Sequence, residues 1–323
     1  MVADVNSSQA RKDRYQILAL SGGGYRGLFT AEYLQCCERA FDCQIKSRFD
    51  LIAGTSIGAL LSAGLALGIP AAQLRAEMER HGPSIFQRSA TTFAKRLLVA
   101  SPYSTDALET AIEAVLTPDG ADLPMSSIDC PLMITAVNYT SGSAAIFRSH
   151  GLAGGRADNV RLRDAILASA AAPTYFPLKK INTDQYADGG LIANAPDMVA
   201  ISDTIATRRS SLDTIYTLSI GTAARRNGAA LHARPLRPSI VSWFFVRGLI
   251  QTVMAAQEDL SLRQATQLLG NRHLRIDEEP AQKQVKAIAG LDHVTPQATD
   301  TLTSLAGAAF ERTKSDRRLR AFF

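Results

Sequence analysis

The chain has 323 residues, a length that admits one large α/β domain or two small ones and can bury a substantial core without disulfides or metals. Hydrophobic residues make up 46% of it and charged residues 20%, as in ordinary soluble globular proteins. The 35 basic and 30 acidic residues give a net charge of +5, which suits an anionic membrane or a phosphorylated ligand but demands neither.

The N-terminal residues lack the features of a secretion signal, because the charged residues at 12–14 precede an apolar run at 17–20 that is too short for one. No acidic or histidine cluster has the spacing of metal ligands. The four cysteines form no CxxC pair and have no histidine beside them: Cys36, Cys37, Cys43 and Cys130. We therefore expect reduced thiols in a cytoplasmic protein, and neither a metal ion nor a cofactor.

Apolar strands alternate with helices along the first two thirds of the chain. Helices are expected after the glycines at 22–24, at 57–67, within 71–121 and at 161–170. Strands are expected at 15–20, 49–53, 132–138, 144–147, 185–187 and 214–220. This alternation predicts an α/β fold, specifically a three-layer α/β/α sandwich with a mainly parallel central sheet.

A glycine-rich loop, Gly22-Gly23-Gly24-Tyr25-Arg26-Gly27, joins the first strand to the first helix. Successive backbone N–H groups at the positive end of a helix form a nest that binds anions. The loop loosely meets the dinucleotide-binding spacing, but no acidic ribose partner is evident at the end of a second strand, and no Gly-Lys-Ser/Thr marks a Walker loop. The other interpretation is an oxyanion hole for an acyl intermediate, in which Arg26 would steady the loop or attract a phosphate.

Residues 51–69 carry no charge over a length that approaches a membrane span. Glycines near the start of this stretch favour a strand, a tight turn and a buried helix instead. At the turn, Gly54-Thr55-Ser56-Ile57-Gly58 fits the nucleophile-elbow pattern G-x-S-x-G, in which small neighbours let the backbone bend sharply and expose the serine. Ser56 is therefore a candidate nucleophile, and Gly54 and Gly58 are the residues that would shape the elbow.

A third motif, Asp188-Gly189-Gly190, follows the short strand expected at 185–187. An aspartate before two glycines is most often only a turn. A serine nucleophile needs a base, however, and on that ground Asp188 is the candidate for it.

Together these motifs resemble the patatin-like phospholipases. In that family Gly-Gly-Gly-x-Arg-Gly precedes Gly-x-Ser-x-Gly, and Asp-Gly-Gly follows a segment like Ser-Ala-Ala-Ala-Pro-x-x-Phe-Pro, which 169–177 matches here. Asn194-Ala195-Pro196 also fits, and the resemblance covers roughly 15–221. The loop begins with Ser21, where many members have aspartate.

The resemblance implies a single patatin-like phospholipase domain over 1–323, with a catalytic core at about 15–221 and a helical and basic C-terminal region at 222–323. It implies a lipid acyl hydrolase of the phospholipase A type that cleaves carboxylic esters of membrane phospholipids with a Ser–Asp dyad. Ser56 would attack the acyl carbonyl and Asp188 would accept its proton. The oxyanion hole would comprise Gly22, Gly23, Gly24, Arg26 and Gly27, with the amides of Gly23 and Gly24 as donors.

Segments of the C-terminal third, 271–277 and 291–294, are similar to bacterial patatin-like effectors that cyclic oligonucleotides activate in anti-phage systems. The similarity implies a cyclic di- or oligonucleotide activator, but no nucleic-acid polymer as a partner. A basic stretch at 223–238 and an aromatic helix at 239–254, with Trp243, Phe244 and Phe245, predict peripheral contact with the inner face of the membrane. Aromatic residues of this kind also occur in cores and dimer surfaces, so the sequence is also compatible with a homo-oligomer.

Two other functions fit parts of the sequence. An α/β-hydrolase esterase would use a Ser–Asp–His triad, and Ser56, Asp188 and His273 occur in the required chain order. A non-catalytic nucleotide-binding protein could keep the same fold. The position of the glycine loop before the nucleophile and the alanine-rich segment favour the dyad.

Overall fold

The computed structural model describes residues 14–86, 103–149, 159–207, 209–224, 249–288 and 290–323. Trp243, Phe244 and Phe245, and all but the first two residues of the basic stretch, lie outside the described residues. The helix expected at 239–254 is described only from Leu249 onward, where it belongs to α11 (Leu249–Leu269).

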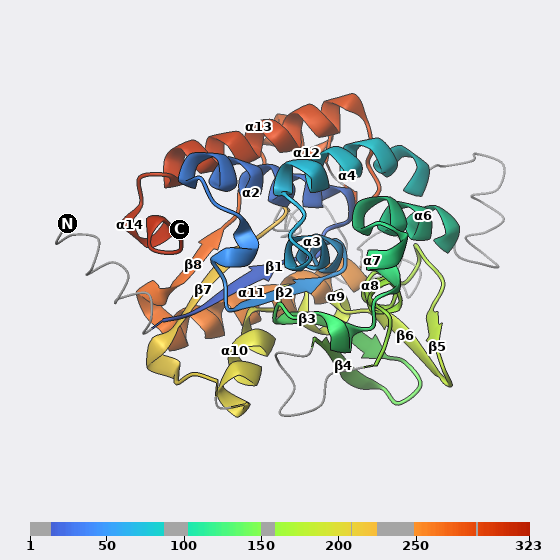
Figure 1. The fold of residues 1–323 in the computed structure, drawn as a ribbon. Helices are drawn as coiled ribbons and strands as arrows, with labels where there is room; N and C mark the ends of the chain where they lie inside the picture. The colour runs from blue at the N-terminus through green and yellow to red at the C-terminus, as the bar shows by residue number, and fades with distance from the viewer. Residues whose placement is uncertain (1–13, 87–102, 150–158, 208, 225–248, 289) are drawn as a thin grey trace, which may run out of the picture.

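One eight-stranded sheet forms the middle of the molecule, in the order β5-β6-β3-β2-β1-β7-β8, with β4 paired to β3 (Figure 1). The strands from β3 through β2, β1 and β7 to β8 are parallel, whereas β4, β5 and β6 form antiparallel pairs at one end. The predicted mainly parallel sheet is therefore confirmed. The strands are β1 (Tyr15–Leu20), β2 (Leu51–Thr55), β3 (Leu132–Asn138), β4 (Ser143–Arg148), β5 (Lys179–Ile181), β6 (Asp184–Asp188), β7 (Ile215–Ile220) and β8 (His273–Ile276).

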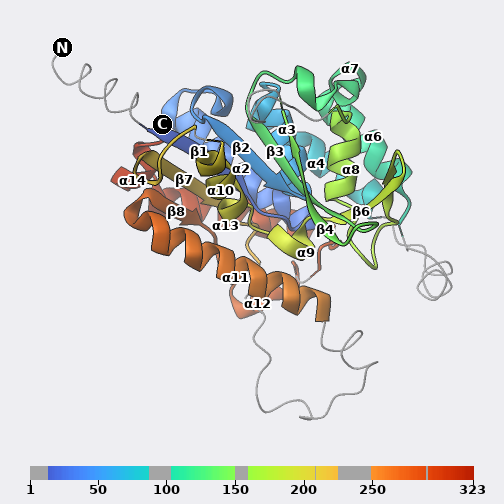
Figure 2. The same ribbon diagram turned by 90° about the horizontal axis from the view of Figure 1, so that it is seen from below.

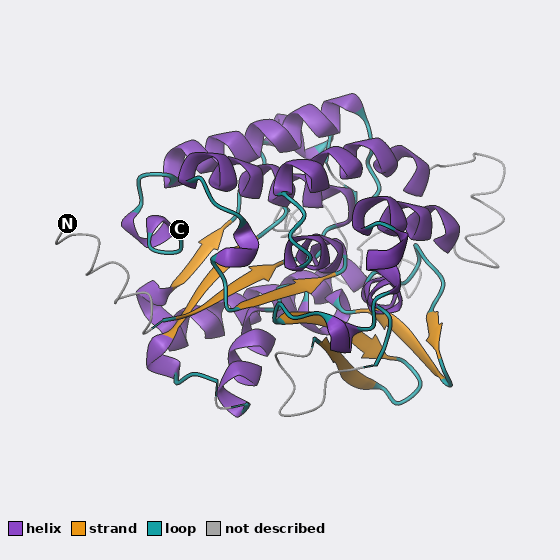
Figure 3. Cartoon of the chain, viewed as in Figure 1, coloured by secondary structure: helices purple, strands orange, loops and turns teal. Residues whose placement is uncertain are grey.

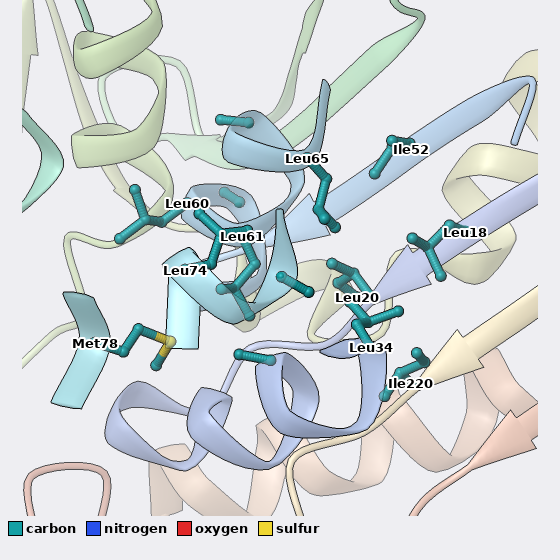
Figure 4. Packing of buried hydrophobic residues seen from close by; sticks show 14 of the residues in the cluster. Leu18, Leu20, Leu34, Ile52, Leu60, Leu61, Leu65, Leu74, Met78 and Ile220 are labelled. Atoms are coloured by element: carbon teal, nitrogen blue, oxygen red, sulfur yellow. The ribbon is translucent and has the colours of Figure 1, made fainter. Parts of the chain in front are cut away.

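Helices cover both faces of this sheet, which confirms the three-layer arrangement (Figures 2 and 3). Adjacent strand residues point to opposite faces. Leu18 and Ile52 accordingly pack in the larger core, against helices that include α2, α3, α4, α6, α8 and α13, as Figure 4 shows in part. Their neighbours Ile17 and Leu51 pack in a second core with residues of α10 and α11.

The helix boundaries follow simple local signals, such as Pro70 before α4 and the side chains of Ser104 and Thr295 that cap α6 and α13. The described helices besides α11 are α2 (Gly27–Phe41), α3 (Ile57–Ala66), α4 (Ala71–Ile85), α6 (Thr105–Leu116), α7 (Pro118–Asp122), α8 (Leu162–Ser169), α9 (Gly190–Ala193), α10 (Asp197–Ala206), α12 (Gln282–Val285), α13 (Pro296–Thr313) and α14 (Arg317–Arg320). Short 3-10 turns occur at Gly24–Arg26, Ile45–Ser47, Met125–Ser127, Leu212–Thr214 and Gly270–Arg272.

The uncharged stretch at 51–69 forms β2, the turn at Ser56 and α3, as the glycines predicted. Its apolar character follows from burial, because β2 and nearly all of α3 lie inside the protein. In the described parts of the chain, no helix has both the length and the apolarity that crossing a membrane would require.

The C-terminal third is part of the same core. β8 extends the sheet beside β7, and α13 packs along α2, where the ring of Phe310 meets Tyr33 edge to face at 5.9 Å. Neither β8 nor α13 was predicted as a separate element, because their short apolar patterns are hard to recognise among the charged residues around them. The last two aromatic side chains, Phe322 and Phe323, pack against Phe49 and Phe41 at ring distances of 5.9 and 4.8 Å.

This packing leads to a stability prediction for α13. Leu302 is fully buried there, so we expect Leu302→Ala to lower the free energy of unfolding by about 2–5 kcal/mol. Denaturant titration followed by circular dichroism measures the change, and a single transition should be kept. Leu260→Ala on α11 is the control, because 56% of that side chain is exposed and the expected change is within about 0.5 kcal/mol. Two separate transitions would contradict a shared core.

Candidate active site

Ser56 occupies a strained turn between β2 and α3. Its backbone angles are φ 57° and ψ −122°, a region that non-glycine residues enter only when the surrounding structure holds them there. Gly54 and Gly58 make the turn possible, since a Cβ atom at Gly54 would overlap the Gly58 carbonyl and one at Gly58 would overlap the carbonyl of Leu20. The structure thus has the strand–turn–helix geometry in which a serine hydroxyl is presented for attack.

Asp188 lies directly against this serine. The Ser56 hydroxyl donates a hydrogen bond of 2.8 Å to Asp188 Oδ2, while the amide of Gly190 donates one of 2.6 Å to Oδ1. Asp188 ends β6, which pairs with β3 opposite Ala136, and β3 in turn neighbours β2. Sheet pairing therefore brings together two residues that are 132 positions apart in the chain.

Burial controls the protonation of this carboxylate. Asp188 is only 2% exposed, and burial raises its pKa from 3.8 to about 6, against the smaller lowering effects of the Gly190 amide and the Ser56 hydroxyl. No salt bridge to Asp188 occurs within the described part of the chain. The higher pKa makes the carboxylate a better proton acceptor than an exposed aspartate, yet it remains ionised at neutral pH.

The alanine-rich segment at 169–177 supports both residues of the pair. The hydroxyl of Ser169 accepts a hydrogen bond of 2.8 Å from the Ser56 amide, and the carbonyl of Ala171 accepts one of 2.9 Å from the Asp188 amide. These two contacts give a physical reason for the segment, because the Ser169 hydroxyl and the Ala171 carbonyl together hold the serine and the carboxylate in place.

The glycine-rich loop has two amides available for an anion. The Gly22 amide donates to the carbonyl of Asn194 at 3.0 Å, and the Tyr25 amide donates to the carbonyl of Leu291 at 2.8 Å. The amides of residues 26 and 27 bond within the loop itself. The amides of Gly23 and Gly24 have no hydrogen-bond acceptor among the described residues. Gly24 has φ 58°, a left-handed conformation that favours glycine.

The predicted oxyanion-hole residues thus differ in what they contribute. The amides of Gly23 and Gly24 are free donors as far as the described residues go, whereas Gly22 and Gly27 let Asn194 and Ile57 pack closely against the loop. Arg26 is partly buried, and burial lowers its pKa. Its Nε atom has no hydrogen-bond partner in the portion of the chain that the structure covers.

An apolar pocket begins at the candidate nucleophile. Ser56 and Gly24 belong to its lining, and most of the rest is aliphatic or aromatic: Leu60, Met78, Ile85, Leu108, Val115 and Phe176. Glu77 and His81 are the polar exceptions, with a distance of 3.3 Å between their side chains. A long hydrocarbon chain fits such a lining better than a polar ligand does. The pocket residues of α4 and α6 were missed from the sequence, where their spacing indicated only helix.

His273 is not placed as the third member of a triad. Its Nε2 atom lies 2.8 Å from Asp197 Oδ1 and its Nδ1 atom lies 3.0 Å from Thr266 Oγ1, so neither ring nitrogen bonds to Ser56 or Asp188. The His273 and Asp197 side chains are both buried, at 2% and 0% exposure, and they join β8 to α10. This arrangement is structural and favours the dyad over the triad.

Comparisons with known proteins identify the family of this chain. A family model described as patatin-like phospholipase matches residues 18–201. A protein of Pseudomonas aeruginosa described as a cGAMP-activated phospholipase is 35% identical over 94% of this chain and 90% of its own length. One from Escherichia coli with the same description is 32% identical over 78% of this chain and 75% of its own. Another from Escherichia coli, described as a cUMP-AMP-activated phospholipase, is 29% identical over 64% of each chain.

The raised pKa of Asp188 predicts how turnover depends on pH. A base must be ionised to accept a proton, so we expect kcat/KM to fall about tenfold per pH unit below a midpoint near 6, which is the pKa of Asp188. The measurement is the pH profile of ester hydrolysis with a soluble substrate. A profile that stays flat to about pH 4 would contradict this assignment, because an ordinary aspartate titrates there.

The matched control is Asp188→Asn, which keeps the shape but removes the charge. The folded state binds the Asp188 proton more tightly than the unfolded chain does, so ionisation costs stability as pH rises from about 4 to 6. The variant should therefore be inactive, as stable as wild type at about pH 3, and more stable by up to roughly 3 kcal/mol at about pH 8.

A His273 variant separates the dyad from the triad. We expect His273→Ala to lower the free energy of unfolding by about 3–5 kcal/mol, because it leaves the buried Asp197 carboxylate without its closest partner. Activity per folded molecule should stay within about tenfold of wild type. His293→Ala is the control, since that residue is only partly buried and, within the described residues, its ring hydrogen-bonds to the Ala287 carbonyl alone, at 3.4 Å. A loss of activity of about 10³-fold or more in folded His273→Ala protein would favour the triad over the dyad.

Proposed function

The chain belongs to the patatin-like phospholipases and is a hydrolase of lipid esters, and from that premise we propose that Ser56 and Asp188 are its catalytic dyad. The observation that carries the proposal is the 2.8 Å hydrogen bond from the Ser56 hydroxyl to a buried carboxylate, beside a loop in which two amides have no acceptor among the described residues. Membrane phospholipid is the proposed substrate.

The chemistry proceeds in two steps. Ser56 Oγ attacks the acyl carbonyl carbon while its proton passes to Asp188 Oδ2, and the amides of Gly23 and Gly24 stabilise the negative oxygen of the tetrahedral intermediate. The intermediate collapses to an acyl-enzyme when Asp188 returns the proton to the departing alcohol, which leaves as a lysophospholipid. Water then attacks the acyl-enzyme with Asp188 again as base, so that the fatty acid is released and Ser56 regains its proton.

The apolar pocket explains why the substrate is a lipid. A fatty acyl chain held among Leu60, Met78 and Phe176 would place its ester carbonyl next to Ser56, which also lines the pocket. Burial of apolar surface stabilises such a complex by about 0.8 kcal/mol for each methylene group. The binding energy of the chain thus brings the ester to the nucleophile.

Peripheral membrane contact is also part of the proposal, because the substrate lies in a bilayer. Large apolar side chains are exposed close to the dyad: Ile192 on α9 at 40% and Val253 on α11 at 48%. The two helices are in contact, since the side chain of Gln257 donates to the Gly190 carbonyl at 3.0 Å. These residues support contact with the lipid surface at the inner face of the membrane.

A cyclic nucleotide is the proposed activator. The support comes from relatives described as cGAMP-activated or cUMP-AMP-activated, one of which matches almost the whole of this chain. The enzyme would stay quiet until the nucleotide binds and would then degrade membrane phospholipid, as an anti-phage effector does.

The test is fatty-acid release from phospholipid vesicles, with and without cGAMP, cUMP-AMP and other cyclic oligonucleotides. We expect release only with one nucleotide, and a loss of at least about 10³-fold in Ser56→Ala. Ser62→Ala is the matched control, because that buried hydroxyl has no hydrogen-bond partner in the described structure and should leave activity unchanged.

The outcomes separate the parts of this proposal. Release without any nucleotide would support the lipase activity but contradict the proposed activator. Release that survives Ser56→Ala would contradict the dyad. A folded protein that binds a nucleotide but releases no fatty acid under any condition would favour the non-catalytic alternative.

A further inference from the structure

The peptide group between Gly22 and Gly23 is held from one side. Its carbonyl oxygen, on Gly22, accepts hydrogen bonds from Thr222 Oγ1 at 3.3 Å and from Asn194 Nδ2 at 3.5 Å. A trans peptide is planar, and its C=O and N–H bonds point in opposite directions. Holding the Gly22 carbonyl therefore also sets the direction of the Gly23 N–H, one of the two free donors of the loop.

Asn194 ties this peptide to the strand that carries the base. It follows Asp188 by six residues, at the end of α9, and its own carbonyl accepts the Gly22 amide at 3.0 Å. Its side chain is only 7% exposed, and its Oδ1 atom has no hydrogen-bond partner among the residues described. A buried amide that leaves its oxygen unpaired needs something else to fix its orientation.

Glu258 on α11 supplies that constraint. Its Oε2 atom accepts a hydrogen bond of 2.6 Å from Asn194 Nδ2. If the amide flipped, Asn194 Oδ1 would face both this carboxylate and the Gly22 carbonyl, and the oxygens would repel one another. The negative charge of Glu258 therefore keeps the Asn194 NH₂ group directed at the loop.

Glu258 is itself fixed by Arg275 of β8. Arg275 donates 2.8 Å hydrogen bonds to Glu258 Oε1 and to Ser21 Oγ, and it also contacts Asp277 at 2.7 Å. Burial alone would lower the pKa of Arg275, but the charges of Asp277 and Glu258 outweigh it and hold that pKa above its ordinary value. The arginine thus stays charged and anchors both α11 and the residue that starts the loop.

We propose that Thr222, Asn194 and Glu258 are positioning residues that hold the Gly22–Gly23 peptide so that the Gly23 amide points at the acyl oxyanion. The inference rests on the dyad of Ser56 and Asp188 and extends it, because it brings a carboxylate of the C-terminal third into the catalytic geometry. None of the three residues touches the reacting atoms.

The first test compares two threonine-to-valine changes. Thr222→Val removes the hydroxyl that bonds to Gly22, whereas Thr217→Val removes one on β7 that is equally buried and has no hydrogen-bond partner in the described structure. We expect kcat for a soluble ester to fall about 10-fold in Thr222→Val with KM unchanged, less than the roughly 100-fold or more for a lost donor. Thr217→Val should match wild type.

The second test compares adjacent acidic residues of α11. Glu258→Gln leaves one acceptor oxygen for three donors, Arg275 and Asn194 and, at 3.5 Å, Ser21, so at least one contact is lost, and kcat should again fall about 10-fold. Asp259→Asn removes the same charge one residue later, where Arg263 is the carboxylate's ion-pair partner among the described residues, and should have no effect.

Binding of a trifluoromethyl ketone is a measurement whose result would not change if these residues only stabilised the fold. Its adduct with Ser56 carries an oxyanion, so its affinity, measured well below the melting temperature of each variant, should weaken in proportion to kcat/KM across the variants. Folded Thr222→Val and Glu258→Gln proteins with wild-type kcat and ketone affinity would overturn the inference. Activity that survives Ser56→Ala would instead overturn the dyad, so the two failures are distinguishable.

Discussion

Close contact between two glycines, Gly54 at the end of β2 and Gly58 in the first turn of α3, determines where the proposed nucleophile lies. The approach of these backbones bends the chain at Ser56 into a conformation that costs about 1–3 kcal/mol. The buried strand and helix on either side offset that cost. Every other part of the site, from the base to the free amides of the loop, is arranged around the hydroxyl that this turn presents.

The site is assembled from distant parts of the chain. The proposed nucleophile and the glycine loop come from its beginning, the proposed base comes from its middle, and the polar cluster behind the loop comes from α11 and β8. Leu291 also contributes, since its carbonyl holds the Tyr25 amide and its side chain lines the pocket. The C-terminal third therefore contributes to the candidate site as well as to the hydrophobic core.

Local motifs were predictable from the sequence because each depends on a few consecutive residues. The turn at Ser56 needs only small neighbours between an apolar strand and an apolar helix, and β1 and β3 occur at their predicted positions. The contact between Asn194 and Glu258 spans 64 residues and depends on how α11 lies against α9. The spacing of apolar residues in the sequence gives no information about such a contact. Asn194 was therefore noted only as part of a motif, and Glu258 was not noted.

Among the residues that the structure describes, no cation pairs with Asp188, and this has a consequence for the end of the reaction. Hydrolysis produces a fatty acid, which ionises at neutral pH and then lies next to a carboxylate that no positive charge of the described residues neutralises. Two such charges about 4 Å apart repel by roughly 4 kcal/mol in a partly buried setting. The same isolation that makes Asp188 a good proton acceptor would thus expel the product, in opposition to the attraction between its hydrocarbon chain and the pocket.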